Sequence, residues 1–277
     1  MSSESLGHLL HSPYLPYALI PASIYAAYRL FYYFLPGAHQ LPALTYKDKT
    51  VLITGASSGL GRALAIELHK HGAKLILTAR SIVKLKELCA ELKTINPNNP
   101  HEPDYSYLDI CEPNGFDQLV SKALANKDGV KKIDVLINNA GLSMRGNIQD
   151  TPIDVHRRVM EVNFFGHVAI TKGLAPHISK DGCIIVVSSV QGKLPIPNRS
   201  SYSSSKHALE AFFDCLRMEQ DIRRHVLIVS AHYIDTGFGS RALDTDGKPI
   251  GTEDQNQKHE ILDRSFEIKQ VWQYCVI

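Results

Sequence analysis

Residues 50–72 read TVLITGASSGLGRALAIELHKHG, in which a strand, a glycine-rich turn and a helix follow one another. The apolar, β-branched run TVLIT predicts the strand, and the spacing of apolar residues predicts a helix over 61–72. The turn contains Gly55, Gly59 and Gly61. Glycines let the backbone turn tightly and approach a pyrophosphate, while the helix offers free N–H groups and the positive end of its dipole. A turn in this position is typical of dinucleotide-binding α/β domains.

Short apolar runs and helical patterns alternate through most of the chain. We predict strands at 50–54, 74–79, 105–109, 133–141, 183–189 and 226–231. We predict helices at 61–72, 81–95, 114–127, 154–179 and from 202 to about 224. Strands that are apolar throughout are buried on both faces, so the pattern indicates an α/β domain with a doubly wound parallel sheet of the Rossmann type. We assign residues 46–250 to this domain.

The end of the second predicted strand carries Arg80 and Ser81. Folds that bind NAD usually place an acidic residue near this point to hold the ribose 2′-hydroxyl, whereas an arginine can hold the 2′-phosphate of NADP. The residues therefore favour NADP(H) as the cofactor. The alternative is that Arg80 is a solvated surface residue.

A tyrosine and a lysine lie four residues apart at the start of the predicted fifth helix, in SSYSSSKHAL, residues 200–209. Side chains at this spacing share one helix face, so an ammonium on Lys206 could favour the phenolate of Tyr202 and make it a usable acid or base. Taken alone, the pattern is common by chance and fits an ordinary serine-rich helix N-terminus. The other motifs decide between the two interpretations.

Taken together, the motifs resemble those of the short-chain dehydrogenase/reductase family over residues 48–237. The motifs are TGASSGLG, the acid Asp109 that ends the third strand, NNAG at 138–141, a mid-helix asparagine, the serine pair 188–189 and the Tyr-x-x-x-Lys spacing. The chain is most similar to a membrane-anchored, NADPH-using branch that includes 11β-hydroxysteroid dehydrogenase-like and dehydrogenase/reductase family member 7-like proteins. That resemblance implies an oxidoreductase.

The resemblance also implies catalytic roles. Tyr202 would be the general acid in ketone reduction, and Lys206 would lower the pKa of Tyr202 and bind the nicotinamide ribose. Ser189 would stabilise the developing alkoxide, with Ser188 as the competing choice. Asn163 would lie in a local distortion of its helix and hold a water in a proton relay to Lys206.

The residues that would hold the cofactor follow from the same resemblance. Asp109 would bind the adenine, Asn138, Ala140 and Gly141 would line the adenosine side, and Thr236 would contact the nicotinamide carboxamide. The complete predicted set is Gly55, Ser57, Ser58, Gly59, Leu60, Gly61, Arg80, Ser81, Asp109, Asn138, Ala140, Gly141, Tyr202, Lys206 and Thr236. Leu142, Met144, Leu194, Ile196 and Phe238 flank the catalytic motifs and could form an apolar pocket; the alternative for each is ordinary packing.

Two features depart from the family pattern. Ala231 and His232 stand where the family has Pro-Gly, and a histidine cannot readily adopt a backbone angle reserved for glycine. After Gly251 the chain lacks a clear helix and seventh strand, so we treat 251–277 as an atypical short tail. A missing strand would leave a sheet edge unpaired.

The first 45 residues form a separate hydrophobic segment. Residues 14–36, YLPYALIPASIYAAYRLFYYFLP, carry Arg29 as their single charge. The uncharged stretch from Ser5 to Tyr28 is long enough to span a bilayer, although prolines interrupt it and it is only modestly hydrophobic. It lacks the charged start and cleavage site of a signal peptide. We expect association with a membrane, and the resemblance suggests the endoplasmic reticulum. The Lys/Arg bias places the domain on the cytosolic side. The alternative is an arm that packs on its own domain or on a dimer partner.

Composition excludes several classes of function. The net charge of +2 and the absence of basic clusters interleaved with aromatic residues give no case for nucleic acid. The five cysteines are scattered without a CxxC motif, which favours reduced thiols. The thirteen histidines form no HExxH motif, and His69 and His71 are two apart, so we predict no metal site.

The sequence thus predicts an NADP(H)-dependent oxidoreductase that interconverts a ketone and a secondary alcohol on a lipophilic substrate such as a steroid, retinoid or lipid. We expect a homodimer that pairs through the helices 154–179 and 202–224. The main alternative is a nucleotide-binding protein whose altered C-terminus has impaired catalysis. A membrane-bound scaffold is a third possibility, supported only by the N-terminal segment.

Overall fold

The computed structural model describes residues 15–34, 45–112, 132–219, 224–234 and 236–251. The chain divides into a small N-terminal unit up to residue 43 and a large unit from residue 44 onward. The predicted helix 114–127 and the predicted tail lie outside the described residues.

The N-terminal unit contains one described helix, α2 (Leu15–Phe34), with Pro21 inside it. Its described side chains are exposed, including the large apolar ones. Arg29 donates a hydrogen bond to the hydroxyl of Tyr25 at 3.0 Å, and the guanidinium lies 5.8 Å from the centre of that ring. Within the part of the chain that the structure describes, no helix has the length and apolar character required to cross a bilayer.

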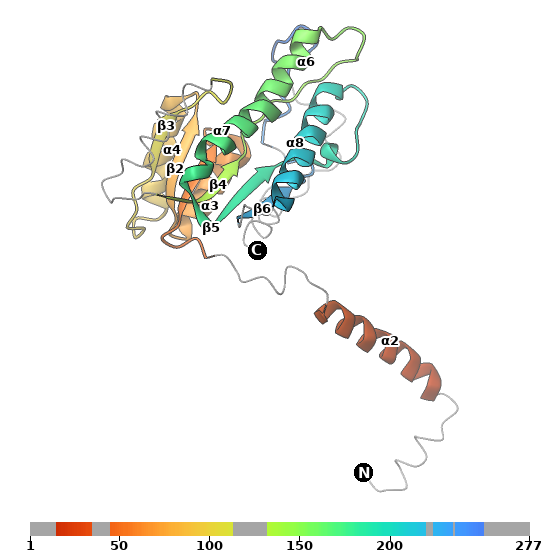
Figure 1. The fold of residues 1–277 in the computed structure, drawn as a ribbon. Coiled ribbons are helices and arrows are strands. Elements are labelled where there is room, and N and C mark those ends of the chain that lie inside the picture. Colours follow the sequence, from red (N-terminus) through yellow and green to blue (C-terminus); the bar gives the residue numbers. More distant parts are fainter. Residues whose placement is uncertain (1–14, 35–44, 113–131, 220–223, 235, 252–277) are drawn as a thin grey trace. The chain divides into compact units, whose positions relative to one another are not determined.

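The large unit is built on one six-stranded parallel sheet with the order β3-β2-β1-β4-β5-β6 (Figure 1). The strands are β1 (Thr50–Thr54), β2 (Lys74–Ala79), β3 (Asp104–Tyr107), β4 (Ile133–Asn138), β5 (Ile178–Val187) and β6 (His225–Val229). The order reverses between β1 and β4, which is the crevice where ligands of doubly wound sheets bind. The predicted fold class is confirmed.

Alternate residues of the central strands face two separate cores, because successive side chains of a strand point to opposite faces. On one face, Ile53 and Leu77 pack with residues of α3 (Gly59–Lys70) and α4 (Ile82–Ile95). On the other, Leu52 and Leu136 pack with residues of α7 (Gly166–Leu174) and α8 (Ser200–Met218). Helices therefore cover both faces (Figure 1).

The predicted helix 154–179 is not continuous. It consists of α6 (Ile153–Met160), a π-helical turn (Glu161–Phe165) and α7, and β5 already begins at Ile178. Apolar periodicity alone could not locate this change, because a π-turn keeps the chain helical while it adds one residue per turn. The resemblance to the family had predicted a distortion here, and the structure shows one.

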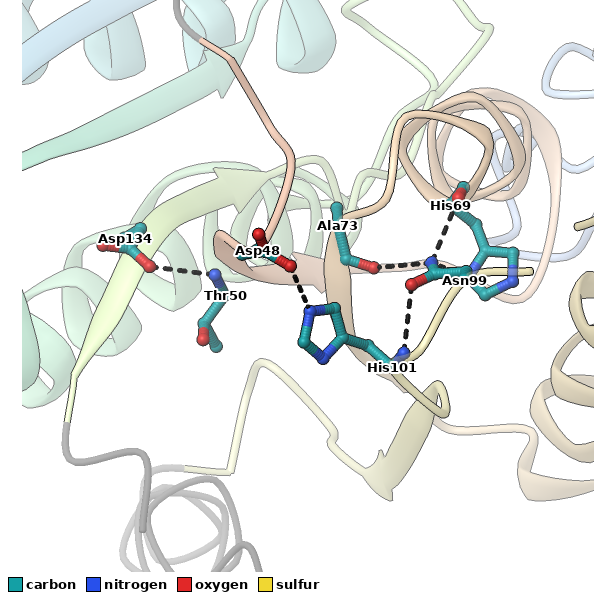
Figure 2. Close-up of polar contacts among 7 residues, drawn as sticks. All are labelled: Asp48, Thr50, His69, Ala73, Asn99, His101 and Asp134. Carbon is teal, nitrogen blue, oxygen red and sulfur yellow. Dashed lines mark hydrogen bonds and ion pairs between the residues drawn. The ribbon is translucent and has the colours of Figure 1, made fainter. Parts of the chain in front are cut away.

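Polar contacts fasten the loop after α4 to the amino ends of the strands (Figure 2). Asn99 donates to the carbonyls of His69 and Ala73, both at 3.1 Å, and its amide nitrogen lies 3.0 Å from Nδ1 of His69. His101 contacts Asp48 at 2.8 Å. Burial lowers the pKa of His69, so it stays neutral in this network. These histidines serve the fold, and the described residues contain no cluster suited to a metal ion.

Candidate active site

A cavity of about 800 Å³ lies beyond the carboxyl ends of the strands and draws its lining from all six strand ends. Its volume is within the range of small-molecule sites. The predicted site residues in its lining are Gly55, Ser57, Ser58, Gly59, Leu60, Arg80, Ser81, Asp109, Ala140, Gly141, Ser189, Tyr202, Lys206 and Thr236. Three predicted residues, Gly61, Asn138 and Asn163, are outside the lining.

The glycine-rich turn forms one end of the cavity and passes close to the turn after β4. Gly55 has φ of +67°, and a Cβ there would lie 2.9 Å from Cα of Ala140. Gly59 has φ of +58° and opens α3. Gly61 packs inward, where a Cβ would lie 2.6 Å from the carbonyl oxygen of Gly55 and would overlap the Asn139 amide. The turn and the N-terminus of α3 therefore suit the pyrophosphate of a dinucleotide.

The asparagine pair after β4 corrects one prediction. Asn138 is fully buried, and its side chain lies against Thr171 and His167 rather than in the cavity. Its neighbour Asn139 lines the cavity and donates to the carbonyl of Thr54 at 2.8 Å. The predicted cofactor contact of the Asn138 side chain is therefore wrong, because the pleat at the strand end turns it inward. The two consecutive asparagines of NNAG were a signal that Asn139, and not Asn138, could be the one that lines the cavity.

Asn163 lies in the π-helical turn and is fully buried. Its side-chain oxygen accepts from the N–H of Leu142, and its amide donates to the Leu142 carbonyl and to the hydroxyl of Ser205. Ser205 lies next to Lys206 in sequence. The side chain of Asn163 thus joins the turn after β4 to α8. The predicted water relay stays a prediction.

The structure separates the roles of the two serines after β5. Ser188 is buried, and its hydroxyl donates to Glu210 at 2.6 Å. Ser189 lines the cavity, accepts from the N–H of Gln191 at 3.2 Å and makes a hydrogen bond with Tyr202. Both serines line the cavity, but the Ser188 hydroxyl is bonded to Glu210, so Ser189 is the serine whose hydroxyl could contact a substrate oxygen.

Tyr202 and Lys206 share the buried face of α8 and both line the cavity. Burial raises the pKa of Tyr202, and the hydrogen bond from Ser189 and the charge of Arg199 offset part of this effect. The phenol is therefore protonated at neutral pH, as a general acid requires. The predicted effect of Lys206 on the pKa of Tyr202 stays a prediction.

Lys206 donates to the carbonyl of Val187 at 2.9 Å and lies 5.8 Å from the centre of the Tyr202 ring. Burial lowers the pKa of Lys206 to about 8, and the charge of Glu210 opposes this effect. The ammonium is thus still the main form at pH 7, and it can supply positive charge and donors inside the cavity.

The apolar residues predicted around the site divide into two groups. Leu142, Leu194, Ile196 and Phe238 line the cavity, and the Phe238 ring lies 6.1 Å from that of Tyr202. Met144 is instead fully buried in a small core cluster.

Several cavity residues were missed by sequence reasoning. Five of them are basic and come from loops and helices: Lys84, Arg145, Arg158, Arg199 and Arg241. Lys84 lies in the first turn of α4, close in sequence to Arg80, and this was a usable signal. The other four lie outside the motifs assigned to catalysis and cofactor binding, so only the tertiary structure shows that they converge on the cavity.

The Ala231–His232 departure does not strain the backbone. Among the described residues, positive φ outside glycine occurs at Asp48 and Asn198, so His232 adopts an ordinary φ. His232 lines the cavity beside Ala231, and Thr236 lies near the glycine turn, 3.4 Å from a Cβ at Gly59. The predicted conflict with a glycine-only angle is therefore wrong.

Comparison with known sequences matches residues 49–246 to the model of a family described as short chain dehydrogenase. The mouse protein dehydrogenase/reductase SDR family member 7B is 44% identical over 76% of this chain, which spans 65% of the mouse protein's length. The Xenopus tropicalis protein of the same name is 40% identical, over 87% of this chain and 77% of that protein.

Solved structures with this fold carry both nicotinamide cofactors. A short-chain dehydrogenase from Escherichia coli CFT073 complexed with NADPH has a TM-score of 0.70 and 26% identity, covering 83% of this chain and 91% of its own. An alcohol dehydrogenase from Thermococcus sibiricus complexed with 5-hydroxy-NADP has a TM-score of 0.68 and 25% identity, covering 83% and 90%. A Burkholderia phymatum protein in complex with NAD, at 22% identity and a TM-score of 0.65 over 83% and 80%, shares the fold.

Proposed function

Because the chain belongs to the short-chain dehydrogenase/reductase family, we propose that it is an NADP(H)-dependent oxidoreductase that interconverts a ketone and a secondary alcohol on a lipophilic substrate, such as a steroid, a retinoid or another lipid. The observation that carries this proposal is the shared cavity. Ser189, Tyr202 and Lys206 line the same cavity as the glycine-rich turn and Arg80. The residues proposed for proton transfer and those proposed for dinucleotide binding thus line one cavity.

Ketone reduction needs a hydride donor, a proton donor and groups that stabilise negative charge, and the cavity residues fit these roles. A bound nicotinamide would supply the hydride. Tyr202, protonated at neutral pH, would donate its proton to the carbonyl oxygen of the substrate. The hydroxyl of Ser189 would donate a hydrogen bond to the same oxygen as negative charge develops there. The ammonium of Lys206 would stabilise the phenolate that Tyr202 leaves behind.

Leucine, isoleucine and phenylalanine side chains around the reacting groups support an apolar substrate. Leu142, Leu194, Ile196 and Phe238 line the cavity, the Phe238 ring lies beside that of Tyr202, and Leu194 is 66% exposed. Burial of an exposed leucine against a ligand contributes about 1.5–3 kcal/mol. A panel of hydrophobic ketones assayed by NADPH oxidation tests the proposal, and no turnover of any ketone would contradict it.

Preference for NADP(H) over NAD(H) is expected to depend on Arg80. Its side chain lines the cavity with Ser81 and Lys84, just beyond β2, where a 2′-phosphate would lie. A charge-assisted hydrogen bond contributes about 1.5–3 kcal/mol. We therefore expect Arg80→Ala to weaken NADPH binding by about 10- to 100-fold and to leave NADH binding nearly unchanged, as measured by fluorescence titration.

Lys86→Ala is the matched control for Arg80→Ala. Lys86 is an exposed cation on α4 and is outside the cavity lining. The Lys86→Ala variant should bind NADPH and NADH with the affinities of the wild type. An unchanged ratio of NADPH to NADH affinity in Arg80→Ala would remove Arg80 from this role.

The alternative of a nucleotide-binding protein with impaired catalysis remains testable. Its sequence support was the Ala231–His232 pair and the tail, and the tail lies outside the described residues. Retained NADPH binding together with no turnover on the ketone panel, and no effect of Tyr202→Phe, would favour it.

We also propose that the N-terminal segment associates with a membrane, with the catalytic unit on the cytosolic side of the endoplasmic reticulum. Support comes from the exposed apolar side chains of α2 and from Arg29, whose guanidinium donates a hydrogen bond to the Tyr25 hydroxyl. We expect the full chain to co-sediment with phosphatidylcholine vesicles. Ile20→Ser, Ile24→Ser and Phe31→Ser together should reduce the bound fraction about tenfold or more, because each apolar side chain contributes about 1.5–3 kcal/mol.

A matched triple variant controls for general loss of apolar surface. Val83→Ser, Ile148→Ser and Ile153→Ser change three exposed apolar residues of the large unit. This variant should bind vesicles like the wild type, and equal binding by the two triple variants would contradict the proposal.

The predicted homodimer stays a prediction, which sedimentation equilibrium would test.

A further inference from the structure

Glu210 is a buried acidic residue on the same helix as the proposed acid and lysine. It lies four residues after Lys206 and eight after Tyr202, and it is 3% exposed. Residues at this spacing share a helix face. A buried carboxylate is costly unless it is paired and hydrogen-bonded, so its partners show what it holds.

The carboxylate of Glu210 joins three segments that surround the active site. One oxygen accepts from Ser188 at 2.6 Å and from Ser230 at 3.0 Å. The other oxygen pairs with Lys193 at 2.8 Å. Ser188 precedes Ser189 at the end of β5, Ser230 precedes Ala231 at the end of β6, and Lys193 follows the short 3₁₀ turn (Val190–Gly192).

Two further observations indicate that these segments are built around the carboxylate. A Cβ at Gly192 would overlap Oε1 of Glu210 and lie 2.9 Å from the hydroxyl of Ser188, so the turn requires glycine beside the acid. Burial would raise the pKa of Glu210, but hydrogen bonds from Lys193, Ser188 and Ser230 outweigh it and hold the pKa below its ordinary value. The group is therefore an anion at neutral pH.

The charge of Glu210 also bears on Lys206. The groups that face Lys206 are Tyr202 and Glu210 on its own helix and His167 on α7. Burial and the charge of Lys206 lower the pKa of His167 to about 3, so this imidazole is neutral. The negative charge of Glu210 favours the ammonium form of Lys206 against the effect of burial.

We propose that Glu210 is a positioning residue of this active site, which fixes the backbone on both sides of Ser189 and keeps Lys206 cationic. This inference rests on the proposed function for the role of Ser189, but its effect on Lys206 can be measured by cofactor binding alone. Glu210 acts through these two residues and is outside the cavity lining.

Glu210→Gln tests the proposal, because it keeps the size of the side chain and removes its charge. Loss of the anion should lower the pKa of Lys206. The affinity for NADPH, titrated by cofactor fluorescence from pH 6 to pH 9, should therefore begin to fall at lower pH than in the wild type. With a ketone that the wild type reduces, kcat should fall about tenfold or more, because displacement by ~1 Å can cost 10²-fold.

Asp214→Asn is the matched control, since Asp214 lies one turn further along α8 and pairs with Arg217 at the surface. It should match the wild type in both readouts. If Glu210→Gln also matches the wild type in the pH profile of NADPH binding, the proposal is wrong, whether or not the chain reduces ketones. A wild type that binds NADPH but reduces no ketone would contradict the proposed function instead.

Ser188→Ala keeps the proposal testable if Glu210→Gln fails to fold. It removes one donor to the carboxylate and retains the charge. We expect a lower kcat with an unchanged pH profile, because Ser189 loses an anchor while Lys206 keeps its anion. A kcat equal to that of the wild type would show that this network does not position Ser189.

Discussion

Tyr202→Phe is expected to reduce the rate of ketone reduction by about 10²- to 10⁴-fold, the usual contribution of a general acid. The change removes one oxygen and leaves the ring in place beside Phe238. NADPH affinity should stay within about threefold of the wild type, since the phenol is one contact among many in a cavity lined by six strand ends. Single-turnover oxidation of NADPH with a saturating ketone measures the effect.

Tyr233→Phe is the control for loss of a phenol, because Tyr233 also lines the cavity. We expect its rate of reduction to stay within about tenfold of the wild type, below the range of an acid catalyst. Comparable losses in the two variants would mean that Tyr202 has no special part in proton transfer.

Lys206→Met is expected to lower kcat/KM by about 10²- to 10³-fold, the cost of removing one preorganised electrostatic stabiliser. Unlike Tyr202→Phe, it should also weaken NADPH binding, because the lysine would contact the nicotinamide ribose. The wild type should show a matching pH dependence. The pKa of Lys206 is about 8, so the reduction rate should be constant below that pH and decline as the ammonium is lost above it.

Lys74→Met supplies the control for a buried lysine. Lys74 is 7% exposed and begins β2 at the amino edge of the sheet, whereas the cavity lies at the carboxyl ends. Its replacement should change stability and leave turnover per folded molecule as in the wild type. A decline in rate above pH 8 that persists in Lys206→Met would assign the titration to another group.

The sequence predicted those parts of the fold that depend on local pattern. β1 and β2 begin and end where predicted, because each is a short, largely apolar run that the sheet buries on both faces. The π-turn around Asn163 was invisible to apolar periodicity, because it depends on hydrogen bonds to Leu142, twenty-one residues earlier in the chain. Such contacts follow from tertiary structure and not from spacing.

The candidate site was predictable where its residues share an element. Tyr202 and Lys206 lie on one helix face, so their spacing alone brings them together. The neighbours Asn138 and Asn139 could not be told apart, because the pleat at the end of β4 decides which one faces the cavity. Arg199 influences Tyr202 from the residue before α8, yet no motif marks it.

Hydride transfer itself is the central claim, and isotope transfer tests it most directly. NADPH deuterated at C4 of the nicotinamide should be incubated with the full chain and a panel of lipophilic ketones, and the products analysed by mass spectrometry. We predict a secondary alcohol with one deuterium on the carbinol carbon for the wild type and little or none for Tyr202→Phe. Saturating NADPH binding with no deuterated alcohol from any ketone would contradict the account.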